Sequence, residues 1–144
     1  MNFKNKVIVI TGASSGIGEA SAIKFAKKNA KIVLVARRKE KLLQLQKKLV
    51  KFTDSTLVCQ CDVSNKTQVK EMTDIVLDTF GRIDVLINNA GFVIYGKVSE
   101  LSIEEIESQM ETNYFGMIYC TKNFLPHMIE QGRGHIVNIA SVGA

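Results

Sequence analysis

Short apolar runs alternate along the chain with longer segments in which apolar residues recur every three or four positions. The runs are rich in β-branched residues and predict buried strands over residues 7–10, 31–36, 56–61, 83–87 and 134–140. The segments between them predict helices over residues 19–26, 42–52, 64–80 and 102–131. Strands that alternate with helices at these lengths indicate an α/β domain, in which a parallel sheet carries helices on both faces.

The first predicted strand ends in a loop with glycines at positions 12, 16 and 18, and a helical pattern follows. A helix N-terminus offers unpaired N–H groups and partial positive charge, and glycines let a phosphate approach the backbone closely. The loop therefore predicts a cradle for the pyrophosphate of a dinucleotide. Its candidate binding residues are Gly12, Ser14, Ser15, Gly16, Ile17 and Gly18.

The glycines allow two other interpretations, a nucleoside-triphosphate loop and an ordinary turn. A nucleoside-triphosphate loop needs Gly-Lys followed by Ser or Thr, and the Gly96-Lys97 pair is followed by Val98, which excludes it. An ordinary glycine-rich turn remains compatible with the glycines when they are taken alone.

The second predicted strand ends at Ala36, about 20 residues past the glycines, where a carboxylate would hold the free ribose 2′-hydroxyl of NAD. Ala36 removes the repulsion that such a carboxylate exerts on a 2′-phosphate. Arg37 can donate a charge-assisted hydrogen bond to that phosphate, worth about 1.5 to 3 kcal/mol. We therefore expect NADP as the cofactor, with NAD less favoured. The alternative is that Arg37 is an ordinary surface cation.

Polar residues also follow the later predicted strands, at the carboxyl edge where doubly wound sheets bind ligands. Asp62 and Val63 close the third strand, and Asp62 either faces the adenine or helps to start the helix at Ser64. The fourth strand ends in Asn88-Asn89-Ala90-Gly91, whose amides can bond backbone and ligand together. Ser141 stands at the carboxyl end of the fifth strand.

The last predicted helix is the longest, and it carries two unusual residues. Ser102 and Glu105 form a capping box at its start, and Pro126 predicts a kink or break. Asn113 lies on its mostly apolar stripe, where an amide costs stability unless it is hydrogen-bonded. Asn113 therefore either caps a local distortion of the helix or serves a site.

The composition is ordinary for a globular domain, with 46% hydrophobic and 23% charged residues. No apolar stretch approaches the roughly 20 residues that a membrane helix needs, and no signal-peptide pattern precedes the first strand, so a cytoplasmic protein is expected. Ten of the 19 Lys and Arg residues lie between Lys27 and Lys51. Without interleaved aromatic residues, this segment predicts a solvated face rather than a nucleic-acid site.

The three cysteines, Cys59, Cys61 and Cys120, show no C-x-x-C spacing and are expected to be buried free thiols. Together with His127 and His135 they supply too few ligands for a metal site, so none is expected.

Several of these motifs together resemble the short-chain dehydrogenase/reductase family, and the resemblance runs over all 144 residues. Thr11–Gly18 is similar to the family's T-G-x-x-x-G-x-G nucleotide loop, and Asn89-Ala90-Gly91 to its N-A-G strand end. The resemblance implies that Asp62 contacts the adenine, that Asn113 is the active-site Asn and that Ser141 is the catalytic Ser.

The resemblance also bears on the choice of cofactor. Arg37 resembles the position that marks NADP-preferring members. The second basic position of those members lies just before the middle glycine, and it is Ser15 in this chain.

On this resemblance the fold is a doubly wound parallel sheet of Rossmann type, incomplete, with five strands in the order 3-2-1-4-5. Residues 1–144 are expected to form a single, truncated dinucleotide-binding domain. The family's Tyr-x-x-x-Lys is missing, because the residues four positions past the three tyrosines are Ser99, Ile118 and Asn123. The family implies that this Tyr supplies a proton in the reaction, so the chain is expected to be inactive as it stands.

The expected function is that of an NADP-dependent oxidoreductase, which interconverts a ketone and a secondary alcohol by hydride transfer, with this chain as its cofactor-binding part. A non-catalytic NADP-binding half-domain is the alternative. The expected partner is a small carbonyl or alcohol substrate, with no nucleic acid or membrane, and the full-length protein is expected to form homo-oligomers. Residues 92–95 either line an apolar pocket or pack under the long helix.

Overall fold

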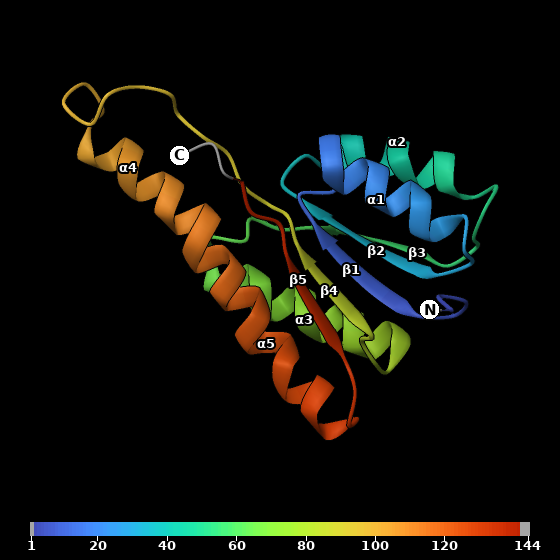
Figure 1. Cartoon of the computed structure of the whole chain (residues 1–144). Coiled ribbons are helices and arrows are strands. Elements are labelled where there is room, and N and C mark those ends of the chain that lie inside the picture. The colour runs from blue at the N-terminus through green and yellow to red at the C-terminus, as the bar shows by residue number, and fades with distance from the viewer. Residues whose placement is uncertain (1, 142–144) are drawn as a thin grey trace.

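The computed structural model describes residues 2–141, which form one parallel sheet with helices on both faces (Figure 1). The strands lie in the order β3-β2-β1-β4-β5, and every neighbouring pair is parallel. The expected fold class and strand order are therefore confirmed. The strands are β1 (Val7–Thr11), β2 (Lys31–Ala36), β3 (Thr56–Gln60), β4 (Val85–Asn88) and β5 (His135–Asn138).

Two helices cover each face of the sheet. Figure 1 shows α1 (Gly16–Ala26) and α2 (Lys39–Leu49) on one side, and α3 (Lys66–Phe80) and α5 (Gly116–Glu130) on the other. Val7 and Val9 of β1 join the apolar core beneath α3 and α5, whereas Ile8 and Ile10 join the core beneath α1 and α2. Alternate side chains of a strand point to opposite faces, so both sides of β1 are buried.

The helix starts differ from the sequence-based expectations. The first helix begins at Gly16 rather than Glu19, so that two of the glycines belong to its first turn. The third begins at Lys66, because Asn65 caps it by accepting a hydrogen bond from the Gln68 amide, and the expected start at Ser64 is wrong.

The long helix is confirmed but is not regular. It consists of α4 (Ile103–Met110), a π-helical turn η1 (Glu111–Phe115) and α5. The predicted capping box of Ser102 and Glu105 is present at its start. Pro126 lies inside α5 without ending it, so the break considered there is wrong, and the irregularity falls at η1 instead.

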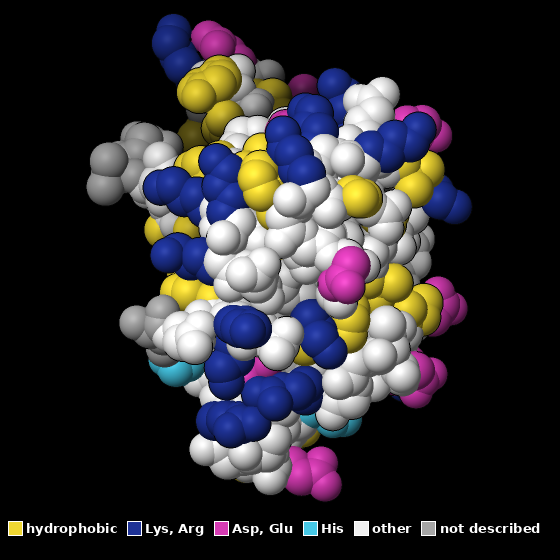
Figure 2. Space-filling view, turned by 90° about the vertical axis from the view of Figure 1, so that its right-hand side faces the viewer, with side chains coloured by type: hydrophobic (Ala, Val, Ile, Leu, Met, Phe, Trp, Pro, Cys, Tyr) yellow, Lys and Arg dark blue, Asp and Glu magenta, His cyan; other side chains and the backbone are white. Residues whose placement is uncertain are grey.

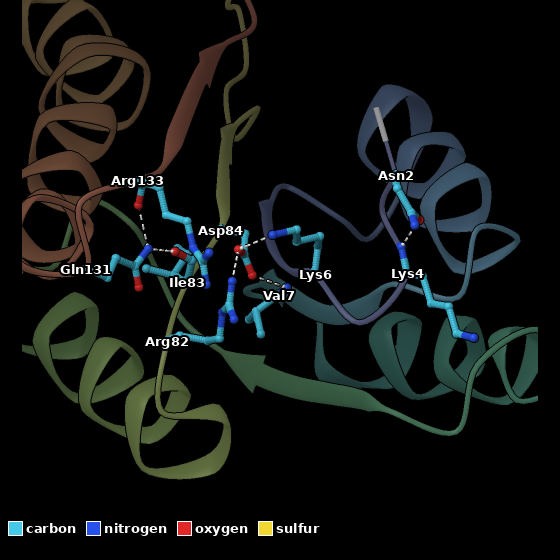
Figure 3. A network of polar contacts seen from close by, with 9 residues as sticks. All are labelled: Asn2, Lys4, Lys6, Val7, Arg82, Ile83, Asp84, Gln131 and Arg133. Carbon is cyan, nitrogen blue, oxygen red and sulfur yellow. Dashed lines mark hydrogen bonds and ion pairs between the residues drawn. The ribbon is translucent and has the colours of Figure 1, made fainter.

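A buried carboxylate joins the amino ends of β1 and β4, at the edge of the sheet opposite the carboxyl ends of the strands (Figure 3). Asp84 accepts hydrogen bonds from the Val7 amide at 2.9 Å, from Lys6 at 3.1 Å and from Arg82. Burial alone would raise the pKa of Asp84, but the hydrogen bonds from Arg82, Val7 and Lys6 outweigh it and hold that pKa below its usual value.

Basic side chains are spread over one face of the molecule. Figure 2 shows Lys and Arg side chains across the middle of this face, with Asp and Glu side chains mainly toward its right-hand margin. Lys27 and Lys51 each lie over the ring of Phe52, at 5.4 and 5.1 Å from its centroid. In the described part of the chain, no helix is long and apolar enough to cross a membrane.

Candidate nucleotide-binding site

A cavity of about 460 Å³ opens at the carboxyl ends of the parallel strands. Its lining comes from the segments that follow β1, β2, β3 and β4, together with one residue of η1. The lining residues are Gly12, Ser14, Ser15, Ala36, Arg37, Arg38, Cys61, Asp62, Val63, Asn89, Ala90, Gly91, Phe92 and Thr112. The structure thus brings together most of the cofactor-binding residues expected from the sequence. Gly16, Ile17 and Gly18 lie in the first turn of α1 instead.

The glycine turn is built so that backbone groups pack closely. Gly12 has a φ of +66°, and a Cβ there would lie 2.8 Å from Asn89 Nδ2 and 2.9 Å from Ala90 Cα. A Cβ at Gly18 would collide with the carbonyl oxygen of Gly12. Glycine is therefore required at position 12 by both conformation and space, and at position 18 by space alone.

Thr11 joins the glycine turn to the end of β4. Its hydroxyl accepts hydrogen bonds from the amides of Asn89 and Ala90, at 2.9 and 3.0 Å, and donates to the Ile87 carbonyl. Asn89 Nδ2 donates in return to the Thr11 carbonyl at 3.0 Å and the Gly12 carbonyl at 3.3 Å. The Asn89 side chain therefore holds the shape of the turn by bonding to the backbone, one of the two roles expected for the amides at this strand end.

Two arginines after β2 reach across the opposite side of the cavity. Arg37 lies 4.0 Å from the Asp62 carboxylate. Arg38 donates to Ser14 Oγ at 2.8 Å and to Ser15 Oγ at 3.0 Å, which brings a guanidinium to the glycine turn. Sequence reasoning missed Arg38 as a site residue. Its only signal was its place next to Arg37.

Asp62 lies at the cavity and also shapes the loop before α3. Its Oδ1 accepts from the amide and the hydroxyl of Ser64, at 3.1 and 2.7 Å. Since the helix starts after Asn65, Asp62 turns the chain before the helix and does not cap it.

Cys61 also lines the cavity, but its chemistry is suppressed. Burial above all, helped by the nearby carboxylate of Asp62, raises the pKa of the Cys61 thiol to about 12. All three cysteines are buried and free, as expected. The Cys61 thiol therefore stays protonated near neutral pH and is a poor nucleophile.

Asn113 lies in the π-helical turn and is fully engaged. Its Oδ1 accepts from the Phe92 amide at 2.9 Å, and its Nδ2 donates to the Phe92 carbonyl at 2.7 Å. The residue thus lies in a helix distortion, but its side chain ties the segment after β4 to the helix and does not cap the π-helical turn. Its role in a site stays a prediction. Ser141 lies beyond β5, on the same carboxyl edge of the sheet.

Comparison with known proteins agrees with this geometry. A family model described as short chain dehydrogenase matches residues 6–144, nearly the whole chain. The chain belongs to the short-chain dehydrogenase family. It is 42% identical over 138 residues to an uncharacterized oxidoreductase of Staphylococcus aureus strain USA300, covering 96% of this chain and 59% of that protein. The chain therefore spans about three-fifths of the length of the curated relatives that it matches.

Solved structures of short-chain dehydrogenases have the same fold. A metagenomic short-chain oxidoreductase in complex with NADP superposes with a TM-score of 0.94, at 34% identity, covering 99% of this chain and 65% of that one. A short-chain dehydrogenase from Bacillus anthracis gives a TM-score of 0.90, at 36% identity, covering 94% of this chain and 57% of that one.

The cavity fits the nicotinamide cofactor that short-chain dehydrogenases use. Open space surrounds Gly16 at the N-terminus of α1, where N–H groups can bind a phosphate, and the two arginines supply donors for a further anionic group. Among residues 2–141, no group of three or more His, Cys, Asp or Glu side chains is placed to hold a metal ion.

Proposed function

We propose that these 144 residues bind NADP as the cofactor-binding part of an oxidoreductase that interconverts a ketone and a secondary alcohol. The observation that carries the proposal is the cavity at the strand ends, with the glycine turn on one wall and two arginines on another. The relative solved in complex with NADP supports it.

Each wall has its own part in binding. The N–H groups at the start of α1, where open space surrounds the Cβ position of Gly16, would hold the pyrophosphate. Asp62 and Val63 would face the adenine from the end of β3. Ala90 and Gly91 would line the nicotinamide end.

The two arginines favour NADP over NAD. Ala36, at the end of β2, carries no carboxylate, and Arg37 and Arg38 both line the cavity beside it. Arg38 brings a guanidinium within 3.0 Å of Ser15 Oγ, the position where NADP-preferring relatives are expected to carry a basic residue. A 2′-phosphate would receive charge-assisted hydrogen bonds there.

NADPH, when bound, supplies a hydride to the carbonyl carbon. The chain's own residues would bind and orient the reactants: Ser141 would hold the carbonyl oxygen, and Asn113 keeps the segment after β4 in place. The sequence has no Tyr-x-x-x-Lys to deliver the proton, so we expect turnover to be slower by about 10² to 10⁴ than with a positioned acid. The 144 residues then act as a non-catalytic NADP-binding unit.

Isothermal titration of the full chain with NADPH and NADH tests the cofactor assignment. We expect micromolar binding of NADPH and binding of NADH weaker by about ten- to a hundredfold, the worth of one or two charge-assisted bonds. Equal affinities would overturn the NADP preference, and no binding of either nucleotide would overturn the function.

The catalytic part of the proposal is tested separately. The chain is mixed with NADPH and a panel of ketones and aldehydes, and absorbance of the reduced nicotinamide is followed. Loss of absorbance at rates typical of enzymes, about 1 s⁻¹ or more, would contradict the expected inactivity of these residues.

A further inference from the structure

The segment that follows β4 is extended, and the burial of its successive residues alternates. Phe92 and Ile94 are half-buried, whereas the side chains of Val93 and Tyr95 are 52% and 89% exposed. Of the two interpretations of residues 92–95, lining a pocket applies to Phe92, which lines the candidate cavity. Val93 and Tyr95 face outward.

Two amide side chains of the long helix hold this segment. Asn113 takes both backbone groups of Phe92, as described above. Gln109, four residues earlier in the last turn of α4, accepts a hydrogen bond from the Ile94 amide through Oε1 at 2.9 Å. Its own Nε2 donates to the Glu105 carbonyl at 3.2 Å, which fixes the orientation of the amide.

The spacing of the two amides matches the spacing of their targets. Two residues of an extended chain span about 6.6 Å. Four residues of a helix rise about 6 Å. In an extended chain, the N–H groups of residues two apart point the same way, so both Phe92 and Ile94 can face the helix. Attachment at Phe92 alone would leave the segment beyond it free to turn, and the bond at Ile94 sets its direction.

Phe92 also lines the candidate cavity, on the side away from the arginines. On the proposed function, the adenosine half of the cofactor lies near Asp62, and the pyrophosphate lies at the start of α1. The nicotinamide half then extends toward Ala90, Gly91 and Phe92. The segment held by Gln109 is therefore the wall of that half of the cleft.

We propose that Gln109 is a positioning residue for the nicotinamide half of the cleft, because it holds Ile94 and thereby the wall formed by Gly91 and Phe92. This inference rests on the proposed function for the identity of the ligand. Gln109 does not itself line the cavity, and it acts through the backbone of the segment.

The test compares Gln109→Met with the wild-type chain. Methionine keeps the length and the helix propensity of glutamine but removes both hydrogen bonds. Amide hydrogen exchange, followed by NMR, should be faster at Ile94 by about five- to tenfold, the worth of one hydrogen bond. NADPH should bind about three- to tenfold more weakly, while 2′,5′-ADP, which carries only the adenosine half, should bind as to the wild type.

Two further variants separate positioning from general structure. Gln109→Glu keeps an oxygen that can accept from the Ile94 amide and should restore slow exchange and NADPH affinity. Ser108→Ala is the matched control, because Ser108 Oγ donates to the same Glu105 carbonyl, within the helix and not to the segment. It should change neither measurement.

If amide exchange at Ile94 is unchanged in Gln109→Met, Gln109 does not hold the segment and the proposal is overturned. Faster exchange with equal weakening of NADPH and 2′,5′-ADP, or with no weakening of NADPH, would overturn its role at the nicotinamide end. A wild-type chain that binds neither nucleotide would instead refute the proposed function, and the inference with it.

Discussion

Arg38 is a site residue because its side chain reaches the glycine turn. It follows Arg37 directly in the sequence, yet its guanidinium turns to Ser14 and Ser15 while that of Arg37 turns to Asp62. Consecutive residues of one cavity thus contact two different loops, the glycine turn and the segment after β3. Position 15 carries no basic side chain of its own, and Arg38 brings one there through space.

Replacement of Arg38 by methionine should weaken NADPH binding by about tenfold, the worth of one charge-assisted hydrogen bond. NADH, which lacks the 2′-phosphate, should lose less than about twofold. Titration calorimetry with both nucleotides measures the ratio. The matched control is Lys39→Met, at the next residue along the chain, and a similar loss in the control would contradict a specific role for Arg38.

Thr11 makes a different contribution, through its hydroxyl. Thr11→Val keeps the shape but leaves the amides of Asn89 and Ala90 without their acceptor at a buried position. We expect the free energy of unfolding to fall by about 1–3 kcal/mol. Urea denaturation measures it. Thr79→Val, which removes an exposed hydroxyl bonded to the Ile75 carbonyl of its own helix, should cost less than about 0.5 kcal/mol.

Among the elements, β1 and β4 are held together at both ends by side chains. Asp84 joins their amino ends, and Thr11 with Asn89 joins their carboxyl ends. Because the glycine turn follows β1 and the N-A-G segment follows β4, these bonds fix the two central walls of the site relative to each other.

Asp84 should make the stability of this strand pair depend on pH. Its folded pKa lies below the unfolded value of about 3.9, so its contribution is present above about pH 4 and is lost as the pH falls through the folded pKa. Asp84→Asn should lower the free energy of unfolding at pH 7 by about 1–3 kcal/mol and flatten its fall between about pH 4 and pH 2. Urea denaturation at a series of pH values measures both effects.

The control for Asp84 is Asp74→Asn, because Asp74 is exposed and pairs with Lys70 on its own helix. Such a surface pair contributes about 0–1 kcal/mol. If the acid-dependent loss of stability is as steep in Asp84→Asn as in the wild type, other carboxyl groups are responsible for it.

At the scale of the whole molecule, the two edge strands of the sheet differ in how much of them is exposed. β3 is packed against α2 and joins its partner β2, while β5 at the other edge is largely exposed. Val137 and Ile139, which follow the strand alternation opposite to Ile136, are each 41% exposed. An apolar strand edge of this kind favours pairing with other chains.

We therefore expect the isolated 144-residue chain to associate as its concentration rises, and Val137→Lys to reduce that association. Sedimentation velocity across a concentration series measures it. Val50→Lys places the same charge at a 68% exposed valine after α2, far from this edge in the sheet order. If both variants reduce association equally, net charge rather than the β5 edge controls it.

Much of the fold follows from local sequence. The apolar runs at residues 7–10 of β1 and 32–36 of β2 need burial on both faces, which a sheet covered by helices on both sides provides. The glycines of the nucleotide loop and the capping box at Ser102 are determined by interactions over a few residues, so the chain alone predicted them. Helix starts were less certain, because Ser64 and Asn65 are both good caps and the bonds of Asp62 to Ser64 decide between them.

The site itself depends on contacts between residues far apart in sequence. The sequence alone determined which residue types stand at the strand ends, because a parallel sheet places every carboxyl end at one edge. Only the tertiary structure decided what each one touches: Arg38 reaches a turn 23 residues earlier, Asn89 bonds to the end of β1, and Gln109 and Asn113 hold a segment that precedes them. Such bonds are long-range and directional, so periodicity and spacing along the chain carry no record of them.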